Sequence, residues 1–179
     1  MPTVDSPLPD NPKPPYPFER TTCACRLCTI NCEHLPGALA PRDLPIIAAH
    51  LGYADLSTFV DECLLASDGA KGFIEGRMIS LPTLVPSTGP DGFCRFLKES
   101  RCSIHAVSPY GCAYIDAHMP DLEFNRRANA LHTELLADRN RQGDYSRLTD
   151  ELHKRGQSAL PLEKRRYRLE KAIRKEMRQ

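Results

Sequence analysis

The 179-residue sequence contains no tryptophan, and only 7% of its residues are aromatic. With so few large side chains, we expect a thin apolar core that needs support from another source. No apolar run approaches the ~18–20 residues that a membrane span needs, which excludes an integral membrane protein. The N-terminus lacks a basic segment followed by an apolar one, so we expect no secretory signal and a cytoplasmic location.

Signatures of common enzyme classes are also missing. The sequence has no G-x-S-x-G motif, no P-loop and no dinucleotide-binding fingerprint, so it gives little direct support for catalysis. The formal net charge is +1, which argues against a polybasic chain that binds nucleic acid over its whole surface.

Cysteine is the residue type in which the sequence is rich. There are eight cysteines, and all of them lie between positions 21 and 119. In a reducing cytosol, this density is more typical of metal ligation or redox chemistry than of disulfides. Thiolates bind zinc at ~2.3 Å, and a local cluster of them can surround one ion.

The candidate ligands form two groups, an early C-x-C-x2-C-x3-C run and a later, looser set. The seven candidate metal ligands are Cys23, Cys25, Cys28, Cys32, Cys94, Cys102 and Cys112. This set exceeds the four thiolates that one tetrahedral ion or one cubane cluster needs. Three arrangements are therefore open: one centre with further structural thiols, two centres, or one polynuclear centre. The bound species is open between zinc, iron and an iron–sulfur cluster.

The eighth cysteine and the histidines are interpreted separately. Cys63 falls on the apolar stripe of a predicted helix, where we expect a small buried side chain. Three histidines near cysteines could add a ligand, although a surface position is the more frequent case: His34, His105 and His118. No metal role is expected for the three histidines on predicted helices: His50, His132 and His153.

Composition divides the chain into three parts. Residues 1–20 hold seven prolines, which favour an extended, disordered arm. Residues 21–119 form the predicted cysteine-cluster domain, and residues 1–119 together carry 9 Lys and Arg against 13 Asp and Glu. Residues 120–179 have no cysteine and carry 15 Lys and Arg against 10 Asp and Glu, which indicates a charged helical extension.

Hydrophobic periodicity and end signals predict the main elements. Helices are expected at residues 42–51, 56–66, 122–140, 145–155 and 162–178. Residues 77–81 are expected to be extended until Pro82 breaks the strand, and 93–97 to pair with 102–105 as a short hairpin. The predicted fold class is α+β: a small metal-stabilised domain with short helices and a hairpin, plus a C-terminal helical extension.

Several of these features occur in the same order in a known family. The motifs are the early cysteines, Pro36-Gly37-x-Leu39-x-Pro41-x-Asp43-Leu44, Leu51-Gly52, Phe93-Cys94-x-Phe96-Leu97, Cys102-Ser103-Ile104, Ser108-Pro109 and Cys112. Over residues 21–116 the chain resembles the YkgJ-like cysteine-cluster family, also called CxxCxxCC or zinc- or iron-chelating. The resemblance implies a metal- or iron–sulfur-binding module. A flagellin lysine methylase, similar only through this domain, carries an iron–sulfur cluster.

The chain also departs from the family pattern. Two adjacent cysteines end the family's first cluster, whereas Cys28 and Cys32 are separated here. His105 stands where the family has tyrosine, and Ser108 where it has arginine.

We therefore expect the chain to bind zinc, iron or an iron–sulfur cluster through its cysteines. One alternative is an enzyme that uses such a cluster for redox chemistry or protein methyl transfer. A second alternative is a nucleic-acid adaptor, because residues 161–179 hold eight Lys and Arg against three Asp and Glu. Metal is the expected partner and a protein partner could use the C-terminal helices, while nucleic acid is less favoured and no membrane is expected.

Overall fold

The structure is a computed structural model that describes residues 16–21, 23–74 and 76–178, and only the backbone of residues 70–74. Residues 1–15 of the predicted proline-rich arm lie outside the described residues. Tyr16 and Phe18, at the end of that predicted arm, are buried in the hydrophobic core. The guanidinium of Arg42 lies 4.5 Å from the ring centroid of Tyr16. These aromatic contacts anchor the chain just before the first cysteines.

Most of the predicted helices are confirmed, with small shifts at their ends. They are α2 (Asp43–His50), α3 (Leu56–Cys63), α5 (Asp121–Asn140), α6 (Asp144–Lys154) and α7 (Leu162–Glu176). Helix α3 begins where the N-cap Asp55 accepts the N–H of Thr58 at 2.7 Å. Its predicted end at Ala66 is wrong, because the chain becomes extended at Leu64 and enters a strand.

Helix α1 (Arg26–His34) is the longest helix of the described chain that apolar periodicity did not predict. It carries Cys28 and Cys32, and Cys25 is its N-cap residue. The three cysteines are spaced by three and four positions, which is a helical period that places their side chains on one face. The signal for this helix was therefore present in the cysteines rather than in the apolar residues.

A long antiparallel hairpin lies at the centre of the fold. Strand β1 (Leu64–Ile74) pairs with β2 (Arg77–Pro86), of which only the first part was predicted. Pro82 does not break β2, because the register shifts at that point and a bulge tolerates a residue without an N–H. Across from it, Gly69 has a φ of +93°, and a Cβ there would lie 1.7 Å from the Leu81 carbonyl oxygen.

The second hairpin forms as predicted but is shorter. Strand β3 (Leu97–Lys98) pairs with β4 (Arg101–Cys102), with Leu97 opposite Cys102. Glu99 and Ser100 have φ values of 48° and 63°, as a tight two-residue turn requires. The chain then passes through the short helices η1 (His105–Val107) and α4 (Tyr110–Ala113).

One hydrophobic core joins the cysteine-rich part to the helices that follow Pro120. Leu131 and Leu135 of α5 belong to the same buried cluster as residues of α2, α3 and the long hairpin. The hydroxyl of Tyr145 in α6 donates to the Leu39 carbonyl oxygen at 2.8 Å and accepts the Leu84 N–H at 2.7 Å. The boundary at residue 120 stays a prediction, but the packing across it is continuous.

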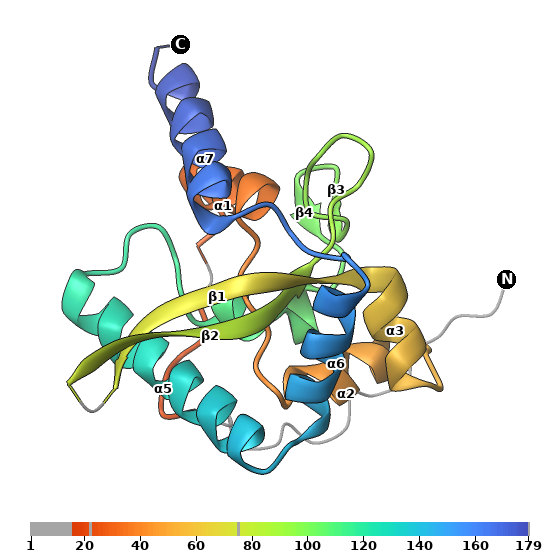
Figure 1. The fold of residues 1–179 in the computed structure, drawn as a ribbon. Helices are drawn as coiled ribbons and strands as arrows, with labels where there is room; N and C mark the ends of the chain where they lie inside the picture. The colour runs from red at the N-terminus through yellow and green to blue at the C-terminus, as the bar shows by residue number, and fades with distance from the viewer. Residues whose placement is uncertain (1–15, 22, 75, 179) are drawn as a thin grey trace, which may run out of the picture.

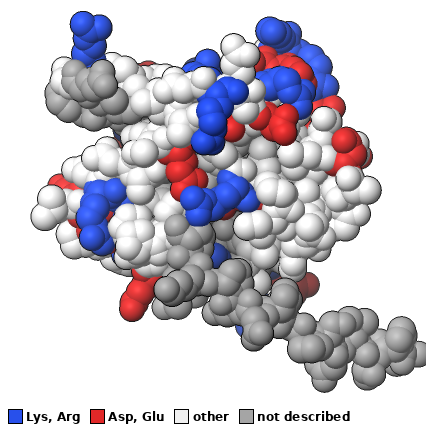
Figure 2. Space-filling view, turned by 90° about the horizontal axis from the view of Figure 1, so that it is seen from below, with Lys and Arg blue, Asp and Glu red and all other residues white. Residues whose placement is uncertain are grey.

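Figure 1 shows how the elements surround the β1–β2 hairpin. Helices α1 and α7 contact each other above it, and α5 runs below it, while α6 contacts both strands. On the face seen from below, basic and acidic side chains are interspersed (Figure 2). Ion pairs of the described chain include Arg139–Asp150 and Arg147–Glu151. Among the described residues, no helix combines the length and the apolar character needed to cross a membrane.

Candidate metal centre

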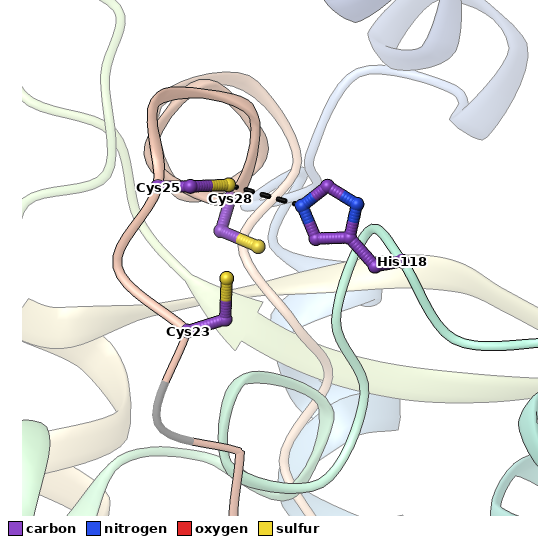
Figure 3. A group of neighbouring side chains, drawn as sticks. All are labelled: Cys23, Cys25, Cys28 and His118. Atoms are coloured by element: carbon purple, nitrogen blue, oxygen red, sulfur yellow. Dashed lines mark hydrogen bonds between the residues drawn. The ribbon is translucent and has the colours of Figure 1, made fainter.

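Three of the predicted ligands meet one histidine at the beginning of α1. The sulfurs of Cys23, Cys25 and Cys28 and one ring nitrogen of His118 all lie within 4.8 Å of one another. Figure 3 shows the sulfurs of Cys23 and Cys28 turned toward each other, and the imidazole of His118 reaching Cys25. We call these four residues the outer group, because Cys23, Cys25 and His118 are exposed and only Cys28 is buried.

The start of α1 favours negative charge on these sulfurs. Cys25 is the N-cap, Cys28 lies in the first turn, and that turn contains no acidic residue. The first N–H groups of a helix lack partners within it, and with the helix dipole they stabilise an anion. Within the part of the chain that the structure describes, no side chain caps α1. A thiolate is therefore favoured at Cys25, where the hydrogen bond with His118 and the backbone N–H of Cys28 also lower the thiol pKa, and the thiolate is the form that binds metal.

A separate hydrogen-bond network holds His118, which lies in the loop before α5. The carboxylate of Asp116 accepts the backbone N–H of His118 at 2.9 Å through Oδ1. Its Oδ2 accepts the hydroxyl of Thr21, also at 2.9 Å. Asp116 thus ties the histidine loop to the segment that leads into Cys23.

Cys25 and His118 form a polar pair across the site. The Sγ of Cys25 lies 3.0 Å from Nε2 of His118. The hydrogen bond to His118 lowers the pKa of Cys25 to about 6, and the same contact raises the pKa of His118. Burial has the opposite effect on Cys28, whose pKa rises to about 12. The pKa of Cys25 is therefore lower than that of Cys28, which makes Cys25 the natural first ligand.

The other four predicted ligands lie elsewhere, in the wall of a cavity of about 410 Å³. They come from α1, the loop after β2, β4 and α4, and we call them the inner group: Cys32, Cys94, Cys102 and Cys112. Cys23 and Cys28 of the outer group also border this cavity. The seven predicted ligands are thus divided between two places that adjoin.

The remaining cysteine and histidines have other surroundings. Cys63 is 2% exposed in the core, as predicted, with its sulfur 3.3 Å from the Tyr53 hydroxyl. His34 stacks edge-on against the Phe93 ring with centroids 5.2 Å apart. His118 is a candidate ligand that the sequence did not favour, because distance along the chain does not show that this loop returns to α1.

Comparisons with protein-family models, with curated proteins and with solved structures find no match to this chain. The resemblance to the YkgJ-like family therefore stays a prediction.

Proposed function

We propose that the chain is a metal-binding module whose outer group holds one zinc ion. The observation that carries the proposal is the approach of three sulfurs and one imidazole nitrogen to within 4.8 Å of one another. Three cysteines and one histidine are a ligand set of structural zinc sites, with bonds of ~2.3 Å to sulfur and ~2.0 Å to nitrogen. A tetrahedral ion with these bonds needs ligand atoms roughly 3.5–3.8 Å apart, so small side-chain shifts suffice.

The ion would join two segments that are distant in sequence. Cys25 and His118 are separated by 93 positions, and one metal bonded to both closes that whole loop. Four protein ligands leave no open coordination position, which is typical of a structural rather than a catalytic zinc site. The proposed role is to fix the entrance of α1 against the loop that leads into α5.

The family resemblance supports the same class of function. The Phe93-Cys94-x-Phe96-Leu97 and Cys102-Ser103-Ile104 elements follow the early cysteines in the order expected for YkgJ-like proteins. We propose membership of that family on this ground.

Zinc content tests the proposal on the full chain. The reduced protein is loaded with zinc, freed of excess metal and analysed by mass spectrometry for zinc per chain. We expect Cys25→Ser and His118→Ala each to hold one zinc ion fewer than the wild type. Circular dichroism checks that both variants are folded.

Two matched substitutions serve as controls. Cys63→Ser removes a thiol from the core, and His50→Ala removes an exposed histidine at the end of α2. Both should keep the zinc content of the wild type. Folded Cys25→Ser and His118→Ala proteins with unchanged zinc content would refute the outer site.

A further inference from the structure

Helix α7 carries most of the positive charge at the C-terminal end of the chain. Residues 161–179 hold eight Lys and Arg against three Asp and Glu, and the proposed zinc site uses none of them. The sequence alone does not show whether these charges are mixed around the helix or gathered on one side. The structure shows which side of α7 is packed, and the rest of the helix is the surface that a partner can reach.

One side of α7 packs against the body of the protein. Leu169 and Ile173 are half-buried on this side, and α7 contacts both α1 and β1. The guanidinium of Arg165 donates to the Ser67 hydroxyl at 2.6 Å and to the Leu160 carbonyl oxygen at 3.0 Å. These hydrogen bonds tie the beginning of α7 to β1 and fix which side of the helix faces solvent.

The three acidic residues of α7 flank its outer side or face the protein. Glu176 is half-buried and pairs with Arg26 of α1 at 3.3 Å. Glu163 lies in the first turn, where negative charge complements the helix dipole. Glu170 pairs with Arg174 at 3.5 Å, and both side chains are largely exposed. An exposed pair of this kind contributes little free energy, so Arg174 can exchange it for another anion.

The outer side of α7 is a continuous row of exposed basic side chains. At 3.6 residues per turn, six of them share one arc of roughly 120° around the helix axis and its immediate continuation. We call this set the basic stripe: Lys164, Arg168, Lys171, Arg174, Lys175 and Arg178. Among the described residues, the pair with Glu170 is the one ion pair that involves the stripe. Figure 1 shows the last turns of α7 extending beyond the other elements.

One aromatic side chain lies within the arc of the basic stripe. Tyr167 is 67% exposed, and within the described part of the chain its ring has no aromatic or cationic partner. Together with Glu170 and four residues of the basic stripe, it lines a groove of about 540 Å³. An exposed ring between cations can stack on a base while the cations bind the flanking phosphates.

This combination favours a single-stranded nucleic acid over a membrane or a duplex. A helix that lies on a membrane inserts its apolar face, but the apolar side of α7, with Leu169 and Ile173, is packed against the protein. A duplex keeps its bases stacked, so the ring of Tyr167 would have no base to stack on. A single strand offers both unpaired bases and phosphates.

We propose that the outer side of α7 binds single-stranded nucleic acid, with the basic stripe along the phosphates and Tyr167 stacked on a base. Neither contact recognises the sugar or a particular base, so RNA and DNA strands bind alike. Because the formal net charge of the chain is only +1, binding depends on this stripe and weakens as salt rises. The inference goes beyond the proposed zinc site and does not rest on it.

Fluorescence anisotropy tests the proposal on the full, zinc-loaded chain. The probes are labelled oligouridylate and oligothymidylate of about 12 nucleotides, a length within the range of single-strand sites. We expect both to bind, with affinity that falls as salt is raised. The double variant Lys171→Gln and Lys175→Gln should bind more weakly. Its slope of log affinity against log salt should shrink by roughly 1.4, or about 0.7 for each lost phosphate contact.

A matched pair of substitutions controls for overall charge. Lys98→Gln combined with Lys154→Gln removes the same charge from exposed positions outside α7 and should bind like the wild type. Tyr167→Ala should weaken single-strand binding roughly tenfold and leave the salt slope unchanged. Tyr167→Phe keeps the ring and should restore the wild-type affinity. Because all these side chains are exposed, the variants should fold, which circular dichroism checks.

Three results would overturn the proposal. The first is a wild type that binds neither oligonucleotide, including one that binds vesicles of phosphatidylserine and phosphatidylcholine instead, which would assign the basic stripe to a membrane surface. The second is equal weakening by the two double-lysine variants, which would reduce the effect to overall charge. The third is a wild type that binds duplex DNA as tightly as a single strand, with the affinity of Tyr167→Ala unchanged.

Discussion

The backbone of Gly37 lies directly against that of Gly111, and the N–H of Gly37 points at the sulfur of the next residue, Cys112, 3.2 Å away. A Cβ on Gly37 would lie 2.2 Å from the carbonyl carbon of Gly111. A Cβ on Gly111 would lie 2.7 Å from Cα of Gly37. The two backbones can approach this closely only because both residues are glycine, so the position of Cys112 depends on Gly37 and Gly111.

Gly37→Ala should therefore destabilise the fold and displace Cys112. Because the nearest atoms are backbone, the clash cannot be relieved by a side-chain rotation, and we expect a loss of ~1–3 kcal/mol in the free energy of unfolding. Urea denaturation measures it. Gly89→Ala is the matched control, since its new Cβ would lie 3.1 Å from the Asp91 side chain and no closer than 3.9 Å to the Phe93 carbonyl oxygen. Equal stabilities of the two variants would contradict the packing described.

Asp116 is expected to act on zinc affinity without touching the metal. Its carboxylate orients the His118 loop, so Asp116→Ala should weaken zinc binding by roughly 10–100-fold, as is typical when the partner of a ligand is removed. Competition with a chromophoric chelator measures the affinity. Asp121→Ala, which removes an acidic side chain in the first turn of α5, should leave the affinity unchanged. An unchanged zinc affinity in Asp116→Ala would show that Asp116 does not support zinc binding.

Cys25 should be the most reactive thiol of the reduced, metal-free chain. With its pKa lowered to about 6 by His118, it is an exposed thiolate at neutral pH, and alkylation should slow as the pH falls through about 6. His118→Ala removes the stabilising hydrogen bond, so alkylation at neutral pH should slow several-fold. Peptide mapping after a short iodoacetamide pulse identifies the modified residue. Equal rates in His118→Ala and the control His50→Ala would contradict the pairing.

His132 in α5 should make the fold sensitive to acid. It is 2% exposed, and neither ring nitrogen has a hydrogen-bond partner among the described residues; burial lowers its pKa. Below ~pH 6.5 the His132 imidazole binds a proton in the unfolded chain but not in the folded one. The free energy of unfolding therefore falls as the pH drops below that value. His132→Leu should remove this loss and stabilise the fold by ~1 kcal/mol or more even at neutral pH, because it removes an unpaired polar group.

Denaturant titrations at about pH 7.5 and about pH 5.5 test the His132 prediction on either side of the ordinary histidine pKa. The wild type should lose more stability between the two values than His132→Leu. His50→Gln, at an exposed position, should behave like the wild type. If the free energy of unfolding of His132→Leu has the same pH dependence as that of the wild type, His132 is not the responsible group.

The sequence predicted the parts of the fold that local periodicity determines. Helices α2, α5, α6 and α7 follow from apolar spacing and from their end residues. Strand β1 was not predicted, because Leu64 also continues the apolar stripe of α3 and the pairing of β1 with β2 leaves no signal in that stripe. Pro82 was misleading for a related reason, since only the register shows that it lies at a bulge.

For the candidate site, the sequence supplied the thiols but not their grouping. The helical spacing of Cys25, Cys28 and Cys32 points the three toward one side, and only the tertiary fold separates Cys32 from the other two. Likewise, His118 becomes a candidate ligand because the fold places the loop before α5 beside the start of α1. The residue types therefore predicted metal-binding side chains, whereas only the fold shows which of them lie together.

The most direct test of the outer site is X-ray absorption at the zinc edge of the full chain loaded with one equivalent of zinc. The account predicts three sulfurs at ~2.3 Å and one imidazole nitrogen at ~2.0 Å. His118→Ala should lose the nitrogen contribution from an imidazole. A wild-type spectrum with four sulfurs, which would place the zinc among the inner thiols, or with oxygen and nitrogen ligands alone, would contradict the account.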